Sequence, residues 1–150
     1  MTIDIYSKGD YPSNVLSNFY PNAFEIDGVK CASMEGFLQS LKFKSPKKQI
    51  EICKLCGKAA KNKGKRKFLW KLTGNVYWQG KRYKRNGAEF AALITRAYGC
   101  LFENETFYNA LKAAENARLT HTAGRENPKK TILTTDEFLS RINELVSKLR

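Results

Sequence analysis

A glutamate, a glutamine and a lysine recur at helical spacing in one stretch of this sequence. Glu35, Gln39 and Lys42, here called the polar row, occupy positions i, i+4 and i+7, within about 60° of one another on a helix. A carboxylate, an amide and an amine in one row provide the groups needed for acid/base catalysis or for covalent chemistry through the amine. An amphipathic helix with an ordinary polar rim has the same pattern, so the spacing alone leaves both interpretations open.

The polar row requires a helix over residues 33–43. Ser33 is a suitable N-cap, which puts Glu35 in the first turn, where the helix dipole favours a carboxylate. Met, Phe and Leu side chains cover the adjacent side of this helix, so the row borders its core-facing side. Polar groups in such a position raise the free energy of the fold unless they are paired or hydrated.

The segment over residues 16–21 precedes this helix and reads Leu-Ser-Asn-Phe-Tyr-Pro. The proline restricts Tyr20 to extended backbone, and we expect Ser17 and Asn18 to point into a cleft. An Asp-Gly pair within residues 24–31 suits the positive φ of a two-residue turn and predicts a short hairpin there.

These segments together resemble the NADAR family, also called YbiA-like. Its members share a pattern of the form LSNFYP…F…DG…EHYFQ..KF. The match is dense over residues 3–43 and weaker toward the C-terminus. The residues that carry it are Leu16-Ser17-Asn18-Phe19-Tyr20-Pro21, Phe24, Asp27-Gly28, Glu35, Gln39 and Lys42-Phe43.

The resemblance implies a single α+β domain over residues 1–150, mostly helical, with small antiparallel strands or hairpins. It also implies N-glycosidase activity, either on base-to-ribose bonds of early riboflavin-pathway phosphates or on ADP-ribosyl-guanine in nucleic acid. Either reaction separates C1′ from a nitrogen through an oxocarbenium-like state. We expect Lys42 to engage the ribose, Glu35 to act as its acid/base partner and Gln39 to hold a ribose hydroxyl.

Two positions depart from the family pattern. Gly36 and Phe37 follow Glu35 where many members have His-Tyr, and His121 lies where many members have a glutamate. Both changes bear on recognition of the leaving group. His121, the single histidine, is a candidate substrate-binding residue; the alternative is a structural hydrogen-bonding residue on a short strand.

Positive charge is concentrated in the middle of the chain. Residues 42–85 carry sixteen Lys and Arg against one acid, Glu51, whereas the rest of the chain carries eleven basic and thirteen acidic residues. Such a field concentrates polyanions near the surface; the alternative is a solvated lysine-rich face that favours solubility. We expect phosphate-bearing partners, with Lys58 and Lys81 holding phosphates.

A second hairpin is predicted over residues 76–85, where aromatic and basic side chains alternate around Gln-Gly-Lys. This mixture is typical of a site for a stacked base and its phosphates, although the aromatic face could instead pack on the core. In the first case Trp78 lies opposite Asn18, Phe19 and Tyr20 across the binding cleft. A non-catalytic nucleic-acid-binding module would use this hairpin and the basic segment without Glu35.

Composition narrows the class of protein. With 42% hydrophobic and 12% aromatic residues the chain is expected to fold, and 150 residues correspond to one domain. No apolar run approaches the roughly 20 residues of a membrane span, and no signal peptide is evident. We therefore expect a cytoplasmic protein with reduced cysteines and no membrane partner. Cys53 and Cys56 lack further ligands at zinc spacing, so no metal is expected. The sequence has no Gly-rich phosphate loop of the Walker or Rossmann type, and no cofactor is expected.

The remaining pattern predicts strands over residues 2–6 and 118–122 and five further helices. Those over 88–102 and 104–115 are interpreted as core scaffold without chemistry. The five predicted helices are 47–56, 58–62, 88–102, 104–115 and 135–149.

Overall fold

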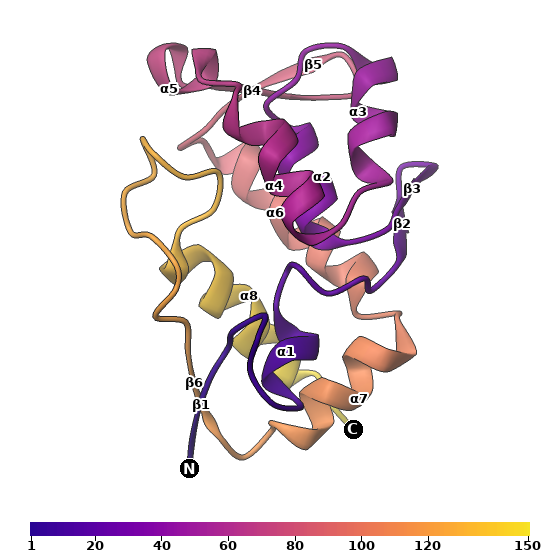
Figure 1. The fold of residues 1–150 in the computed structure, drawn as a ribbon, viewed down its shortest axis with the longest axis vertical. Helices are drawn as coiled ribbons and strands as arrows, with labels where there is room; N and C mark the ends of the chain where they lie inside the picture. The colour runs from indigo at the N-terminus through magenta and orange to yellow at the C-terminus, as the bar shows by residue number, and fades with distance from the viewer.

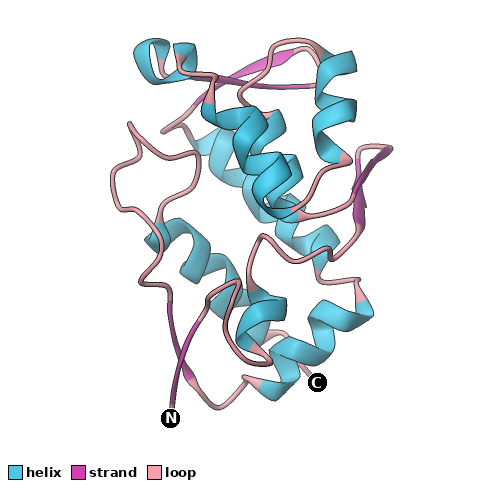
Figure 2. Ribbon diagram, viewed as in Figure 1, coloured by secondary structure: helices cyan, strands magenta, loops and turns pink.

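The computed structural model describes residues 1–150 and contains eight helices and six short strands (Figure 2). The fold is the expected mostly helical α+β domain with small two-stranded sheets. None of its helices combines the length and hydrophobicity that a membrane span requires. In chain order the elements are β1 (Thr2–Asp4), α1 (Ser13–Leu16), β2 (Phe24–Ile26), β3 (Val29–Cys31), α2 (Met34–Ser40), α3 (Pro46–Cys53), α4 (Gly57–Lys65), α5 (Leu69–Thr73), β4 (Asn75–Trp78), β5 (Lys81–Lys84), α6 (Ala88–Leu101), α7 (Glu105–Ala113), β6 (Arg118–Thr120) and α8 (Thr135–Ser147).

The six strands form three separate pairs. The predicted hairpins are confirmed as the antiparallel pairs β2–β3 and β4–β5. Their two-residue turns have positive φ at both positions, 51° and 79° at Asp27 and Gly28 and 48° and 85° at Gln79 and Gly80, as tight hairpin turns require. The third pair joins β1 to β6 in parallel, so the two predicted terminal strands meet each other.

Helix α2 forms as its sequence predicts and lies among its neighbours with every residue buried. The Ser33 Oγ caps it by accepting a hydrogen bond from the Gly36 amide at 3.0 Å, and donates one to the Leu55 carbonyl at 2.9 Å. A Cβ at Gly36 would lie 2.6 Å from that same carbonyl oxygen. Glycine therefore lets the connection from α3 to α4 pack directly on α2.

The molecule is elongated, with α6 running between its two ends (Figure 1). Helices α2 to α5 and the β4–β5 hairpin lie at one end, and α1, α7 and α8 lie at the other. A single cluster of 31 buried residues runs through the chain. The apolar stripe of α6, from Phe90 to Leu101, supplies the middle of that cluster, in agreement with its predicted scaffold role.

Helix boundaries differ from the predictions mainly in the basic segment. Gly57, with φ of 51°, begins α4 instead of only interrupting a helix, and α4 continues to Lys65. Two short helices lie outside the predicted set: α1 has four residues and α5 has five. Helices this short lack the repeated apolar spacing from which a helix is recognised.

Candidate functional site

The polar row lies on one side of α2 and its continuation, as its spacing predicts. The Gln39 Nε2 donates to the Glu35 Oε2 at 2.7 Å. Glu35 and Gln39 are only 9% and 5% exposed, and Lys42 is half-buried two residues beyond the end of the helix. The buried carboxylate and amide are therefore hydrogen-bonded neighbours, and the half-buried amine of Lys42 follows them along the chain.

Burial displaces the acid/base equilibria of both ionisable members of the row. Desolvation raises the pKa of Glu35, an effect opposed by the Gln39 hydrogen bond and by the charges of Lys42 and Lys61. Desolvation also lowers the pKa of Lys42 to about 8, against the opposing charge of Glu35 and with the help of Lys71 and Lys61. Burial thus favours the protonated form of Glu35 and the neutral form of Lys42.

Helix α4 closes over the middle of the row. A Cβ at Gly64 would lie only 1.7 Å from the Gln39 Oε1, so this glycine makes the close approach of α4 to α2 possible. The Gln39 Oε1 is buried and has no hydrogen-bond partner. An unpaired buried amide oxygen destabilises a fold, and such atoms tend to occur where a structure serves a function.

The segment before β2 packs against the N-terminus of α2. The Asn18 carbonyl accepts a hydrogen bond from the Glu35 amide at 3.0 Å, and its Oδ1 accepts one from the Tyr98 hydroxyl at 2.7 Å. Phe19 and Tyr20 are half-buried beside it. Ser17 is buried, and its Oγ accepts a hydrogen bond from the Phe19 amide at 3.2 Å, so it stabilises the turn.

Tyr98 is a residue of the site that the sequence did not reveal. It lies on α6, the helix interpreted as scaffold. Its hydroxyl is buried close enough to the polar row that the charge of Glu35 contributes to its raised pKa. Burial is the main cause that raises the pKa of Tyr98, so its hydroxyl stays protonated and donates to Asn18. The signal available in the sequence was a polar-tipped aromatic on an apolar helix face.

Trp70 and two lysines complete the surroundings of Lys42. The Lys42 Nζ lies 5.5 Å from the centroid of the Trp70 ring, and the Lys71 Nζ lies 6.0 Å from it. The Lys61 Nζ lies 5.9 Å from the centroid of the Phe19 ring, and its charge helps to lower the pKa of Lys42. The Trp70 Nε1 is buried without a partner. These three residues belong to the basic segment over 42–85. The sequence singled out Lys58, Trp78 and Lys81 there instead.

The structure places Trp78 in the core and not beside the polar row. Its side chain is 3% exposed, its ring packs edge-on against Phe37 with centroids 5.0 Å apart, and its Nε1 donates to Asp27 at 2.8 Å. Phe37 is two residues after Glu35, hence about 200° around the helix. The ring therefore has no open face for a base, and the predicted second wall of the cleft does not form there.

The other predicted binding residues lie apart from the row. Lys81 pairs with Glu89 at 2.6 Å on the surface, and Lys58 is exposed in the first turn of α4. The His121 Nδ1 lies 2.8 Å from the Ile5 carbonyl, and its ring packs 4.9 Å from that of Phe138. His121 thus has the contacts of a structural residue that joins β6 to α8.

The cysteines lie in structural positions. All four are free thiols, with Cys31 and Cys53 buried. The Cys56 Sγ lies 3.7 Å from the Ala32 carbonyl, so this thiol contacts the backbone that leads into α2. No three His, Cys, Asp or Glu side chains are grouped so that they could hold a metal ion.

Known proteins that resemble this chain fall in two groups. The sequence model of a family described as bacteriophage protein GP30.3 matches residues 10–147. An uncharacterized 17.1 kDa protein of the Gp30-rIII intergenic region of Enterobacteria phage T4 is 34% identical over 149 residues, 98% of each chain. The NMR structure of E. coli YbiA has a TM-score of 0.60 at 20% identity and covers 99% of this chain and 82% of YbiA. That likeness shows a shared, YbiA-like fold.

Proposed function

The chain belongs to the bacteriophage protein GP30.3 family, and we propose that it is an N-glycosidase that cleaves the bond between a base and a ribosyl or ADP-ribosyl group. The observation that carries the proposal is the pair formed by buried Glu35 and half-buried Lys42, whose pKa values are displaced in opposite directions by desolvation. The YbiA-like fold supports it, because the NADAR-type pattern in the sequence falls on the segments that surround this pair.

Lys42 and Glu35 divide the reaction between them. The neutral amine of Lys42 attacks C1′ while the C1′–N bond breaks, and protonated Glu35 gives its proton to the departing base. The sugar ring then opens to an imine on Lys42, and water hydrolyses the imine to release the sugar and restore the amine. In this scheme Gln39, which is hydrogen-bonded to Glu35, holds a ribose hydroxyl.

A direct route uses the same residues differently. Lys42 then stays protonated and stabilises negative charge, and ionised Glu35 activates a water molecule that displaces the base. The lowered pKa of Lys42 favours the covalent route, because an amine that titrates at about 8 is partly neutral near physiological pH.

The surface near α5 favours ADP-ribosylated nucleic acid over a ribosyl-phosphate small molecule as the substrate. Phe68, Leu69 and Leu72 are 63%, 65% and 76% exposed, and the neighbouring positions 65, 66, 67 and 71 are all Lys or Arg. Exposed aromatic and aliphatic side chains among cations suit unstacked bases and their phosphates. The same surface is what a non-catalytic nucleic-acid-binding module would use, and that is the second candidate function.

Product analysis separates the two functions. The protein is incubated with ADP-ribosylated DNA and, separately, with aminouracil ribose phosphates, and the products are identified by mass spectrometry. We expect free ADP-ribose or ribose phosphate with the wild type and about a hundredfold less, or lower still, with Glu35→Gln. Salt-dependent DNA binding without product from either substrate would refute the glycosidase and support the binding module.

A further inference from the structure

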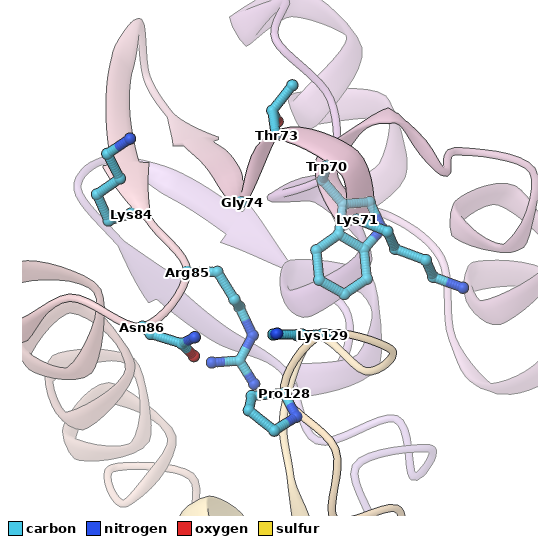
Figure 3. A pocket seen from close by; sticks show the side chains of 9 residues that line it. All are labelled: Trp70, Lys71, Thr73, Gly74, Lys84, Arg85, Asn86, Pro128 and Lys129. Atoms are coloured by element: carbon cyan, nitrogen blue, oxygen red, sulfur yellow. The ribbon is translucent and has the colours of Figure 1, made fainter.

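A basic pocket of about 210 Å³ opens beside Trp70, between α5, the connection from β5 to α6 and the loop at Pro128 (Figure 3). The hydrogen bond from the Arg85 amide to the Gly74 carbonyl, 2.8 Å long, ties two of these segments together. The pocket therefore forms where secondary-structure elements meet, with one side on the loop before α8. It is smaller than the pockets that enclose a drug-sized ligand, roughly 300 Å³ and above.

Positive charge dominates the lining of this pocket. Lys71, Lys84, Arg85 and Lys129 line it, and no aspartate or glutamate does. Arg85 is paired with Glu137 at 2.6 Å, whereas none of the three lysines forms an ion pair. Three uncompensated cations around one small space repel one another, and an anion bound between them would relieve that repulsion.

Arg85 provides a fixed donor group at the centre of the pocket. It is 3% exposed and donates through Nε to the Thr131 carbonyl at 3.2 Å and through Nη1 and Nη2 to Glu137 at 3.0 and 2.6 Å. These bonds use three of its five N–H groups, which leaves two. Figure 3 shows the side chains of Asn86 and Lys129 directed toward the guanidinium, whereas the amines of Lys71 and Lys84 extend outward, away from it.

Trp70 connects the pocket to the polar row. Its indole lines the pocket, and the same ring lies 5.5 Å from the Lys42 Nζ. Lys71 also belongs to both places, because it lines the pocket and its charge helps to lower the pKa of Lys42. A ligand with its sugar at Lys42 would thus have its phosphates one indole ring away.

We propose that this pocket binds the phosphate groups of the substrate, with Lys84, Lys129 and Asn86 as ligands and Arg85 as the fixed base of the site. The identity of the rest of the ligand rests on the proposed function, whereas phosphate binding itself does not depend on it. The volume of about 210 Å³ is sufficient for phosphate groups. The proposal thus assigns phosphate binding to Lys84 and Lys129 and not to Lys58 and Lys81, the residues expected from the sequence. Lys129 lies outside the basic segment.

Calorimetry with phosphate compounds tests the site without any turnover. Inorganic pyrophosphate, ribose 5-phosphate, ADP-ribose and a short single-stranded oligonucleotide are titrated into the wild type, Lys84→Gln, Lys129→Gln and the double variant at low ionic strength. Lys58→Gln is the matched control, because it removes one exposed charge from the same end of the molecule. A hydrogen bond to a charged group contributes about tenfold in affinity or more.

We expect pyrophosphate and ADP-ribose to bind about tenfold more weakly to each single variant and about a hundredfold more weakly to the double variant. Lys58→Gln should stay within about twofold of wild type, and Lys129→Arg should retain most of the affinity because it keeps a charged donor for phosphate. The preferred compound among the four identifies the source of the phosphate. An equal loss in Lys58→Gln and in the pocket variants, or no loss in the double variant, would overturn the proposal.

Activity distinguishes this site from the polar row. With a substrate that turns over, the double variant should raise KM and retain kcat, since its residues do not touch the reacting atoms. Glu35→Gln should lose kcat and bind pyrophosphate like wild type. If no substrate turns over, the binding results still decide the pocket, so the glycosidase and the phosphate site can fail separately.

Discussion

The two sides of α2 differ in what they contribute to the molecule. On one side Phe37 packs edge-on against Phe24 and Trp78, with ring centroids 6.1 and 5.0 Å away, and the Trp78 Nε1 has its hydrogen-bond partner. On the other side Glu35 and Lys42 have displaced pKa values and Gln39 has an unpaired buried oxygen. The first side stabilises the fold, whereas the second lowers its stability.

This difference teaches where to look for function in a small buried helix. Apolar packing and satisfied hydrogen bonds explain the Phe37 side completely. The polar row has no such explanation, because hydrophobic residues of similar volume would stabilise the fold at least as well. Two glycines hold the row in place: Gly36 against the Leu55 carbonyl and Gly64 against Gln39.

The largest expected effect separates activity from stability on the polar side. Glu35→Gln removes the proposed proton donor and should lower kcat about 10²- to 10⁴-fold. Because the pKa of Glu35 is raised by burial, a neutral amide fits the site more easily, and the oxygen of the introduced amide can still accept a hydrogen bond from Gln39. Thermal unfolding should therefore occur at the same or a higher temperature. Normal turnover in this variant would show that the row is structural.

Replacement of Trp78 should lower stability and leave activity largely unchanged, the opposite of the effect expected for Glu35→Gln. Trp78→Ala removes a buried ring and its bond to Asp27, which should lower the unfolding free energy by about 3–5 kcal/mol. The kcat of the folded fraction should stay within a fewfold of wild type. Denaturant unfolding measures the stability, and assays at low temperature measure the activity. Trp78→Phe is a milder variant if Trp78→Ala does not fold. A loss of activity with stability retained would return Trp78 to the site.

Gly64 offers a way to disturb the row without touching its residues. The Cβ of Gly64→Ala would lie 1.7 Å from the Gln39 Oε1, so the amide must move, and such displacements reduce rates by up to about a hundredfold. Gly99→Ala is the matched control in α6, where a Cβ meets nothing within 4 Å. It should keep full activity and stabilise the helix by about 0.5–1 kcal/mol. Equal activities of the two variants would contradict the role of Gln39.

The smallest effect is a shift in the pH profile. Under the covalent route Lys42 must be neutral and Glu35 protonated. With a substrate whose base leaves without a proton only the first condition remains, so kcat/KM should rise with pH through about 8, the pKa of Lys42 in the fold. The charge of Lys61 helps to lower that pKa, so Lys61→Ala should raise it and move the rise to higher pH. Lys58→Ala, on the same helix, should leave the profile in place. An unchanged pH profile in Lys61→Ala would indicate that a group other than Lys42 controls the rise in kcat/KM.

Local pattern was enough to predict much of this structure. Helical spacing and the Ser33 cap predicted α2, its polar row and the longer helices, and Asp-Gly and Gln-Gly predicted both hairpin turns. The parallel pairing of β1 with β6 was not predictable in this way, because three-residue strands from opposite ends of the chain carry no local signal for each other.

The arrangement of the candidate site was predicted only where its residues follow one helix. Alternation in the 76–85 hairpin located its strands but not the face that is buried, so the prediction of Trp78 in a cleft is wrong and its ring lies in the core. Tyr98 was hidden among apolar residues that form the stripe of α6. Lys129 joins the consecutive Lys84 and Arg85 only through tertiary packing of two distant segments, which residue spacing in the sequence does not reveal.

Borohydride trapping tests most directly whether Lys42 does the chemistry. Wild-type protein and Glu35→Gln are incubated with substrate and sodium borohydride, and the digested protein is mapped by mass spectrometry. A reduced sugar adduct should form on Lys42 of the wild type during turnover, with no adduct on the neighbouring exposed Lys44. Continued product release in borohydride, with Lys42 unmodified, would contradict the covalent role of this lysine.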